Sequence, residues 1–338
     1  MKLIEPALKT WPTTTRHEPL NGQTVTYSVC SARVGDNGGP PLTAERVVGP
    51  ELLQALIQAK RLFSVLRVIE EAYDVLMGNY LDLEDTVLRL CSRELAQRHN
   101  YGRSDHFDTA RRACHRALAN LLSSARAFDD QSCAAISALF GNGSAELAEH
   151  KAAFNRAYDA SLGYRVMAGL RNHAQHQGLS VSGVSFGRRI APGGDTRREI
   201  WVTPYIALDD LRQSPKVKAA LVREVERWLC ERSPDGQDTF SIIPFTRAYV
   251  SGLATVIASA RERFAAGEAE AEATICSAFY QYTGFFAQGS DVSLEIVEAH
   301  DGHPSASAYY GSSRLIAARR LREINGLLPD LPRSTIVQ

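Results

Sequence analysis

Residues 171–176 carry the side chains of this chain that are best suited to chemistry. They lie near the end of a predicted helix and read Arg171, Asn172, His173, Ala174, Gln175 and His176. A guanidinium stays charged and offers several donors in a fixed fork, so it can bind a phosphate. An imidazole titrates near neutral pH and can accept or donate a proton. The segment therefore predicts a site that binds phosphate and transfers a proton without a metal.

Helix geometry sorts these residues onto faces. With about 100° per residue, Gln175, Asn172 and His176 follow Arg171 at roughly 40°, 100° and 140° around the axis. An apolar stripe lies on another side of the same helix and consists of Met167, Leu170 and Ala174. Since residues three and four apart share a face, the helix should have one polar face and a separate apolar one.

The elements that must hold this segment are predominantly helical. Apolar residues recur at spacings of three and four along the first half of the chain, which is typical of helices with one buried stripe. Ser144 is a plausible N-cap for the segment's own helix, and Gly178 a plausible C-cap. The predicted helices run from Pro50 to Gly78 and then over 82–98, 105–128 and 145–176.

Strand patterns appear in three other places. Residues 23–30 and 291–297 alternate between apolar and polar, with a period of two. Residues 179–186 and 199–206 also read as strands, and the glycine-rich segment between them suggests a hairpin with a basic loop. Further helices are predicted over about 215–230, 243–264, 268–286 and 312–325, with Gly267 separating two of them.

We therefore expect a mainly α protein, built as an antiparallel helical bundle with a small antiparallel β-hairpin insertion and a further helical C-terminal region. The expected divisions are an N-terminal arm with one strand (1–48), the bundle (49–178), the hairpin (179–206) and the C-terminal helical region (207–338).

Composition limits the partners and the cellular location that the chain can be expected to have. The 38 Lys and Arg residues equal the 38 Asp and Glu residues, so the whole chain gives no electrostatic case for nucleic-acid binding, although a local basic patch could still provide one. Six scattered cysteines without a Cys-x-x-Cys pair suggest reduced thiols. No segment has the apolar length of a signal peptide core or a membrane span. We expect a cytoplasmic protein with no membrane partner.

The pattern Arg-Asn-x-x-x-His at the end of an amphipathic helix resembles the HEPN superfamily, over about residues 50–178. Arg171 and His176 match the two anchors of that family, and Asn172 matches the polar residue that often follows the arginine. The resemblance implies a metal-independent endoribonuclease that needs no cofactor and works as a homodimer, with the two motifs meeting in a cleft. Toxins, phage-defence proteins and RNA-processing enzymes belong to this family, so an antitoxin or another regulatory partner is possible.

The resemblance also implies roles for these residues. Arg171 would stabilise the pentavalent phosphorus, His176 would act as general base or acid, and Asn172 would orient the phosphate or the histidine. The 2′-hydroxyl of a single-stranded RNA would attack the neighbouring phosphate. Further RNA contacts are expected from Gln175 and from the arginines of the hairpin segment, namely Arg188, Arg189, Arg197 and Arg198.

Other interpretations stay open. The bundle could be a non-catalytic binding or regulatory module for RNA, a nucleotide or a protein, with the 171–176 cluster serving only to cap its helix. The hairpin arginines could be a solvated turn. Pairs spaced as His-x-x-His, at 173–176 and 300–303, could hold a metal, although no metal is expected. The arginines of the last helix, Arg314, Arg319, Arg320 and Arg322, are expected on a solvated face.

Overall fold

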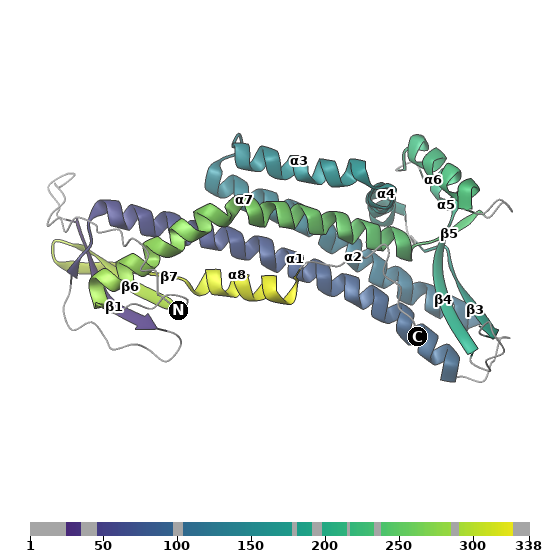
Figure 1. Ribbon diagram of the computed structural model, residues 1–338, viewed down its shortest axis with the longest axis horizontal. Helices are drawn as coiled ribbons and strands as arrows, with labels where there is room; N and C mark the ends of the chain where they lie inside the picture. The colour runs from purple at the N-terminus through teal and green to yellow at the C-terminus, as the bar shows by residue number, and fades with distance from the viewer. Residues whose placement is uncertain are drawn as a thin grey trace, which may run out of the picture. The chain divides into compact units, whose positions relative to one another are not determined.

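The computed structural model describes residues 25–34, 46–96, 104–177, 181–190, 198–214, 217–232, 238–284 and 291–326, with the backbone alone at 104, 172–177, 190 and 198 (Figure 1). The expected mainly helical fold with small antiparallel sheets is confirmed. The chain divides into two compact units. Unit 1 comprises Met1–Glu71 and Arg261–Ile324, and unit 2 comprises Ala72–Ala260 and Asn325–Gln338. None of the described helices combines the length and apolarity needed to cross a bilayer.

Unit 1 consists of helical segments and a four-stranded antiparallel sheet of order β2-β1-β6-β7. Its strands are β1 (Val25–Val34), β2 (Arg46–Val47), β6 (Val292–His300) and β7 (His303–Gly311). Its helical parts are the first part of α1 (Pro50–Ala96), the last part of α7 (Ile243–Thr283) and α8 (Ser313–Ile324). The N-terminal strand thus pairs with a strand from the C-terminal part of the chain.

Both predicted strands of unit 1 are confirmed, and their alternation explains the core. Val292, Leu294 and Ile296 are buried, as expected for alternate residues that face the same side of a sheet. In β1 the register shifts between Val29 and Ser31, where an extra residue forms a bulge. Because a bulge exchanges the two faces of a strand, Val29 and Ala32 are both buried despite their odd spacing.

Strand β7 was not expected from the sequence. A two-residue turn joins β6 to β7, and both turn residues have positive φ, 51° at Asp301 and 81° at Gly302. Positive φ at both positions is the requirement of a type I′ hairpin turn, which Asp-Gly satisfies well. The strand that follows is mostly exposed and contains few apolar residues, so the Asp-Gly pair was its only sequence signal.

Unit 2 holds the remainder of the helices and a three-stranded antiparallel sheet of order β3-β4-β5. Its complete helices are α2 (Ser104–Phe140), α3 (Ala145–Ala160), α4 (Leu162–Gln177), α5 (Leu208–Gln213) and α6 (Ala219–Arg232). Its strands are β3 (Gly183–Ile190), β4 (Arg198–Ala207) and β5 (Thr239–Ser241). The predicted hairpin is confirmed by the pairing of β3 with β4, and the later part of α1 and the first part of α7 complete the unit.

Two predicted helix breaks are wrong. Helix α1 continues through Gly78, and α7 continues through Gly267. A glycine within a helix costs only about 1 kcal/mol relative to alanine, and buried side chains on both flanks outweigh that cost. Leu76, Tyr80 and Leu83, for example, are all buried around Gly78.

The sequence also missed one helix break, because residues 145–176 form two helices and not the single helix that was predicted. Ser144 caps α3 as predicted, its hydroxyl accepting the Leu147 N–H at 3.2 Å. Ser161 then adopts an extended backbone, and its hydroxyl accepts the Tyr164 N–H at 3.2 Å. The new helix, α4, is seen end on in Figure 1, so it crosses α3 steeply instead of continuing it.

Gly163 allows α4 to approach α7 within unit 2. A Cβ atom at Gly163 would lie 2.6 Å from Ala248 Cβ and 3.1 Å from the Phe245 carbonyl oxygen, whereas one at Gly78 would have no described atom within 4 Å. We expect Gly163→Ala to lower the free energy of unfolding by about 2 kcal/mol through overpacking. Gly78→Ala should raise it by about 1 kcal/mol through helix propensity. Urea denaturation would measure both, and equal effects of the two substitutions would contradict the close approach.

Candidate functional site

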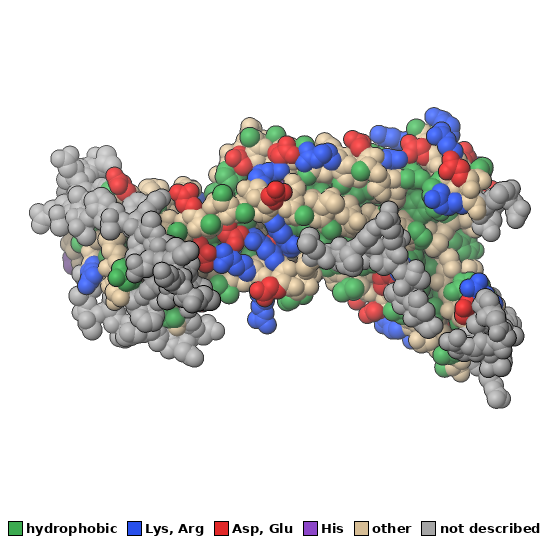
Figure 2. Space-filling view, in the orientation of Figure 1, with side chains coloured by type: hydrophobic (Ala, Val, Ile, Leu, Met, Phe, Trp, Pro, Cys, Tyr) green, Lys and Arg blue, Asp and Glu red, His purple; other side chains and the backbone are tan. Residues whose placement is uncertain are grey.

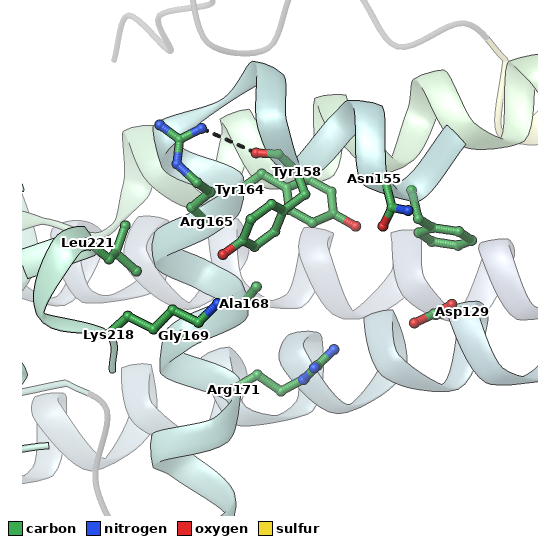
Figure 3. Close-up of a pocket in the computed structure, with 11 residues that line it drawn as sticks. Asp129, Asn155, Tyr158, Tyr164, Arg165, Ala168, Gly169, Arg171, Lys218 and Leu221 are labelled. Atoms are coloured by element: carbon green, nitrogen blue, oxygen red, sulfur yellow. Dashed lines mark hydrogen bonds between the residues drawn. The ribbon is translucent and has the colours of Figure 1, made fainter. Parts of the chain in front are cut away.

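A pocket of about 300 Å³ lies in unit 2, among α2, α3, α4 and the start of α6 (Figure 3). This volume is at the lower end of the range found for small-molecule sites, enough for a ligand the size of one nucleotide. Polar and aromatic side chains form much of its wall: Asp129, Asn155, Tyr158, Tyr164, Arg165, Arg171 and Lys218.

Arg171 is the residue of the predicted motif that lines this pocket. It is half-buried in the later part of α4, and Figure 3 shows its guanidinium extending toward the Asp129 side of the cavity. Burial raises the pKa of Asp129, and the positive charges of Arg126 and Arg171 offset only part of that rise. A carboxyl group that is costly to ionise therefore shares the pocket with the arginine of the motif.

Arg165 forms a structural wall of the pocket. Its Nε and Nη2 donate to Glu224 Oε2 at 3.2 and 2.7 Å, which connects α4 to α6. Its Nη1 donates to the carbonyl oxygens of Tyr158 and Asp159, at 3.3 and 2.8 Å, at the end of α3. A cation at a helix C-terminus satisfies free carbonyls and interacts well with the helix dipole. Because each of its three nitrogens already donates to the protein, Arg165 positions the site but is poorly placed to bind a ligand.

Lys218 supplies a second cation. It is exposed, directly precedes α6, and in Figure 3 its amino group extends toward Ala168 and Gly169 on α4. Within the described part of the chain, no carboxylate lies within ion-pair distance of it. The charged side chains that line the pocket are those of Arg165, which is paired with Glu224, and those of Arg171, Lys218 and Asp129. The pocket is therefore positive overall and suited to an anion such as a phosphate.

Tyrosines form the aromatic part of the wall. Tyr164 is buried and packs edge-on against Tyr249, with ring centroids 4.6 Å apart, and Tyr158 packs against Tyr164 at 6.1 Å. Burial raises the pKa of Tyr249 to about 12. Burial also raises the pKa of Tyr164, so the phenols of Tyr164 and Tyr249 stay neutral at physiological pH. The packed tyrosine rings provide a rigid, partly apolar surface beside the cations.

The other motif residues lie on the same helix. The backbone of Asn172, Gln175 and His176 belongs to α4, and their side chains lie outside the described part. In helix geometry His176 follows Arg171 by about 7.5 Å along the axis and about 140° around it. The predicted placement of both anchors near the end of one helix is confirmed, while the roles given to them stay predictions.

The hairpin arginines occupy two different settings. The sequence placed Arg188 and Arg189 in the loop that connects the two strands, and this prediction is wrong, because both residues lie in β3 itself. Arg188 forms an ion pair with the buried Glu94 at 2.7 Å, and Arg189 pairs with Glu199 across the hairpin. Arg198 begins β4 with its side chain outside the described part, and Arg197 lies outside it altogether. Two of the four arginines therefore have carboxylate partners already.

The metal alternative finds no support in the described residues, where no three His, Cys, Asp or Glu side chains come together as a ligand set. His300 and His303 face each other across the type I′ turn, and His300 Nε2 lies 2.8 Å from Glu298 Oε1. His173 and His176 belong to the part of α4 described by backbone alone.

Sequence reasoning missed Asp129, Asn155 and Lys218. Each lies on a different element from Arg171, and nothing in the local pattern around them differs from an ordinary solvated helix position. Only the packing of α2, α3 and α6 around α4 brings them to one pocket. Tyr158 and Arg165 flank the helix break at Ser161, which was also unexpected.

Comparisons with known proteins add no assignment. No family model, no curated protein and no solved structure matches the chain.

Asp129 gives the site a measurable pH dependence. Because its folded-state pKa is raised above the ordinary value of about 3.9, the folded state binds this proton more tightly than the unfolded state does. Stability contributed by Asp129 is thus complete below that ordinary value and is lost as pH rises through the folded-state pKa. The test compares the free energy of unfolding of wild type with that of Asp129→Asn. We expect the difference, wild type minus variant, to fall as pH rises from the ordinary pKa of the carboxyl group to its folded-state pKa. Urea titrations from pH 3.5 to 7 would test this, and a difference that grew with pH would contradict it.

Proposed function

We propose that this chain is a metal-independent, HEPN-like endoribonuclease that cleaves single-stranded RNA. The observation that carries the proposal is the position of Arg171, which lines a positively charged pocket of nucleotide size on the same helix as His176. Lys218 and the tyrosine wall add a second phosphate-binding cation and an aromatic surface, which are features of single-strand binding sites.

The proposed reaction is a transesterification within the RNA. The 2′-oxygen attacks the adjacent phosphorus, and His176 accepts the proton of the 2′-hydroxyl or later supplies one to the leaving group. Arg171 stabilises the charge on the pentavalent phosphorus, and Asn172 orients the phosphate or the histidine. The bond to the 5′-oxygen breaks and that oxygen takes up a proton. The products are a 2′,3′-cyclic phosphate and a 5′-hydroxyl, and the reaction needs no metal or other co-reactant.

The proposal includes a homodimer in which two copies of the 171–176 segment share a cleft. It also places the protein in the cytoplasm, where RNA is available and where the free thiols of all six cysteines fit the reducing conditions. A role as a toxin or phage-defence effector, held in check by an antitoxin or regulatory partner, fits a nuclease of this type.

A cleavage assay with a chelator tests the proposal. Wild type, Arg171→Ala and His176→Ala are incubated with single-stranded RNA and EDTA, with Arg116→Ala, an exposed arginine of α2, as control. We expect wild type and the control to cleave RNA in the presence of EDTA and to leave cyclic phosphate ends. In both site variants the cleavage rate should fall by at least about 100-fold. Chelator-sensitive cleavage, or cleavage unchanged in both variants, would overturn the proposal. RNA binding with no cleavage by wild type would assign the non-catalytic alternative instead.

A further inference from the structure

A second hollow adjoins the pocket on the other side of Arg165. It is an open groove of about 550 Å³ between the start of α4 and one face of α6. Arg165 lines both the pocket and the groove, and its partner Glu224 lines the groove. A ligand longer than one nucleotide that filled the pocket could therefore continue past Arg165 into the groove.

The groove has charge and aromatic surface of its own. Arg223 and Arg227 are both exposed and four residues apart on α6, so they project from the same face of the helix. Among the described residues neither has a carboxylate within ion-pair distance. Figure 2 shows Lys and Arg side chains over α6, interspersed with acidic ones. Since Arg165 and Glu224 neutralise each other, the two arginines face only Glu231, and the groove is positive like the pocket.

Trp228 supplies the aromatic surface. It is half-buried in the groove wall, with its ring held edge-on against Phe245 at a centroid distance of 4.9 Å. The guanidinium of Arg232 lies over the ring at 4.6 Å. A fixed aromatic side chain beside arginines is the combination that binds unpaired bases and their phosphates with little sequence preference.

We propose that this groove binds the RNA strand on one side of the nucleotide held in the pocket. Arg223 and Arg227 contact phosphates of the neighbouring nucleotides, and Trp228 provides a surface for a base. The identity of the ligand as RNA rests on the proposed function. An acidic polypeptide would satisfy the arginines, but it would not use the aromatic surface or the phosphate-binding cations of the adjoining pocket.

Binding measurements on the full chain test the groove apart from catalysis. The probe is a fluorescent 12-nucleotide oligouridylate with 2′-O-methyl groups, which removes the attacking hydroxyl, and uridine monophosphate serves as the competitor for the pocket alone. The test variant is Arg223→Gln with Arg227→Gln. The matched control is Arg112→Gln with Arg116→Gln, which removes the same charge at the same spacing from an exposed face of α2.

We expect the test variant to bind the 12-mer about tenfold more weakly, with a slope of log affinity against log salt smaller by about 1.4, since each lost phosphate contact on a single strand is worth about 0.7. Binding of uridine monophosphate and the behaviour of the control should match wild type. Unchanged affinity in the test variant, an equal loss in the control, or displacement of the 12-mer by polyglutamate as effectively as by RNA would overturn the groove proposal. If the binding results are as expected but wild type cleaves no RNA, the nuclease proposal is overturned and the groove proposal stands.

Discussion

Replacing Glu70 with glutamine is expected to lower the free energy of unfolding by about 3 kcal/mol, the cost of removing one partner from a buried ion pair. Glu70 is only 2% exposed in unit 1 and accepts hydrogen bonds from two arginines. Arg261 donates to both of its oxygens at 3.0 and 2.7 Å, and Arg322 donates to Oε1 at 2.6 Å. Glutamine keeps the size of the side chain but leaves both guanidinium groups with less negative charge than they need.

The contacts beyond Glu70 make the effect larger than that of a single pair. Arg322 also donates to Glu268 at 2.7 Å, and Arg319 joins Glu268 to Glu272 at 2.9–3.0 Å. Three arginines and three glutamates thus alternate in one network that connects α1, α7 and α8. The loss of one charge in such a network disturbs every neighbour.

Glu71→Gln is the matched control, because it removes the same charge one residue along the same helix. Glu71 is 48% exposed and pairs with Arg67 in an i, i+4 arrangement that is worth less than about 0.5 kcal/mol. Urea denaturation followed by circular dichroism would compare the two variants with wild type. Equal losses of stability would show that the buried network contributes no more than a surface pair does.

This network corrects one expectation from the sequence. The arginines of the last helix were expected on a solvated face, yet Arg319 and Arg322 bind glutamates of α7 and α1. Their partners lie far away in the chain, at Glu70 and Glu268. A charged helix face has the same composition whether it meets water or the opposite charge on another helix, so the local pattern could not separate the two cases.

Local rules predicted those parts of the fold that depend on neighbouring residues. The Ser144 cap, the alternation of Val292, Leu294 and Ile296, and the β3–β4 hairpin are confirmed. Where a local preference is weak, tertiary packing determines the helix boundaries. Helices α1 and α7 continue through Gly78 and Gly267, whereas the predicted helix over 145–176 is interrupted at Ser161.

The candidate site also contains residues that the local sequence predicted and residues that it could not predict. Arg171 could be singled out because an arginine and a histidine near the end of one helix can together bind a phosphate and transfer a proton. Asp129 and Lys218 could not, because they come from α2 and the start of α6 and meet Arg171 only through the α3–α4 turn and the Arg165–Glu224 bridge. The sequence predicted a chemistry for Arg171, and the structure shows which pocket Arg171 lines.

The proposed dimer can be tested by restoring activity from two inactive proteins. Arg171 lines a pocket of its own chain, whereas the backbone position of His176 lies about 140° further around the axis of the same helix. If two copies meet around a two-fold axis, Arg171 of one copy and His176 of the other form each site. We therefore expect a mixture of Arg171→Ala and His176→Ala proteins, allowed to exchange subunits, to cleave RNA much faster than either protein does alone.

The expected recovery is about a quarter of the wild-type rate, since random exchange makes half of the dimers mixed and each mixed dimer has one intact site of two. Native mass spectrometry would confirm that mixed dimers form. Mixing His176→Ala with the double variant, Arg171→Ala with His176→Ala, is the control and should recover nothing, because no chain then supplies His176. Mixed dimers without recovered cleavage would place Arg171 and His176 of the same chain in one site, and a protein that stays monomeric at assay concentration would contradict the shared cleft.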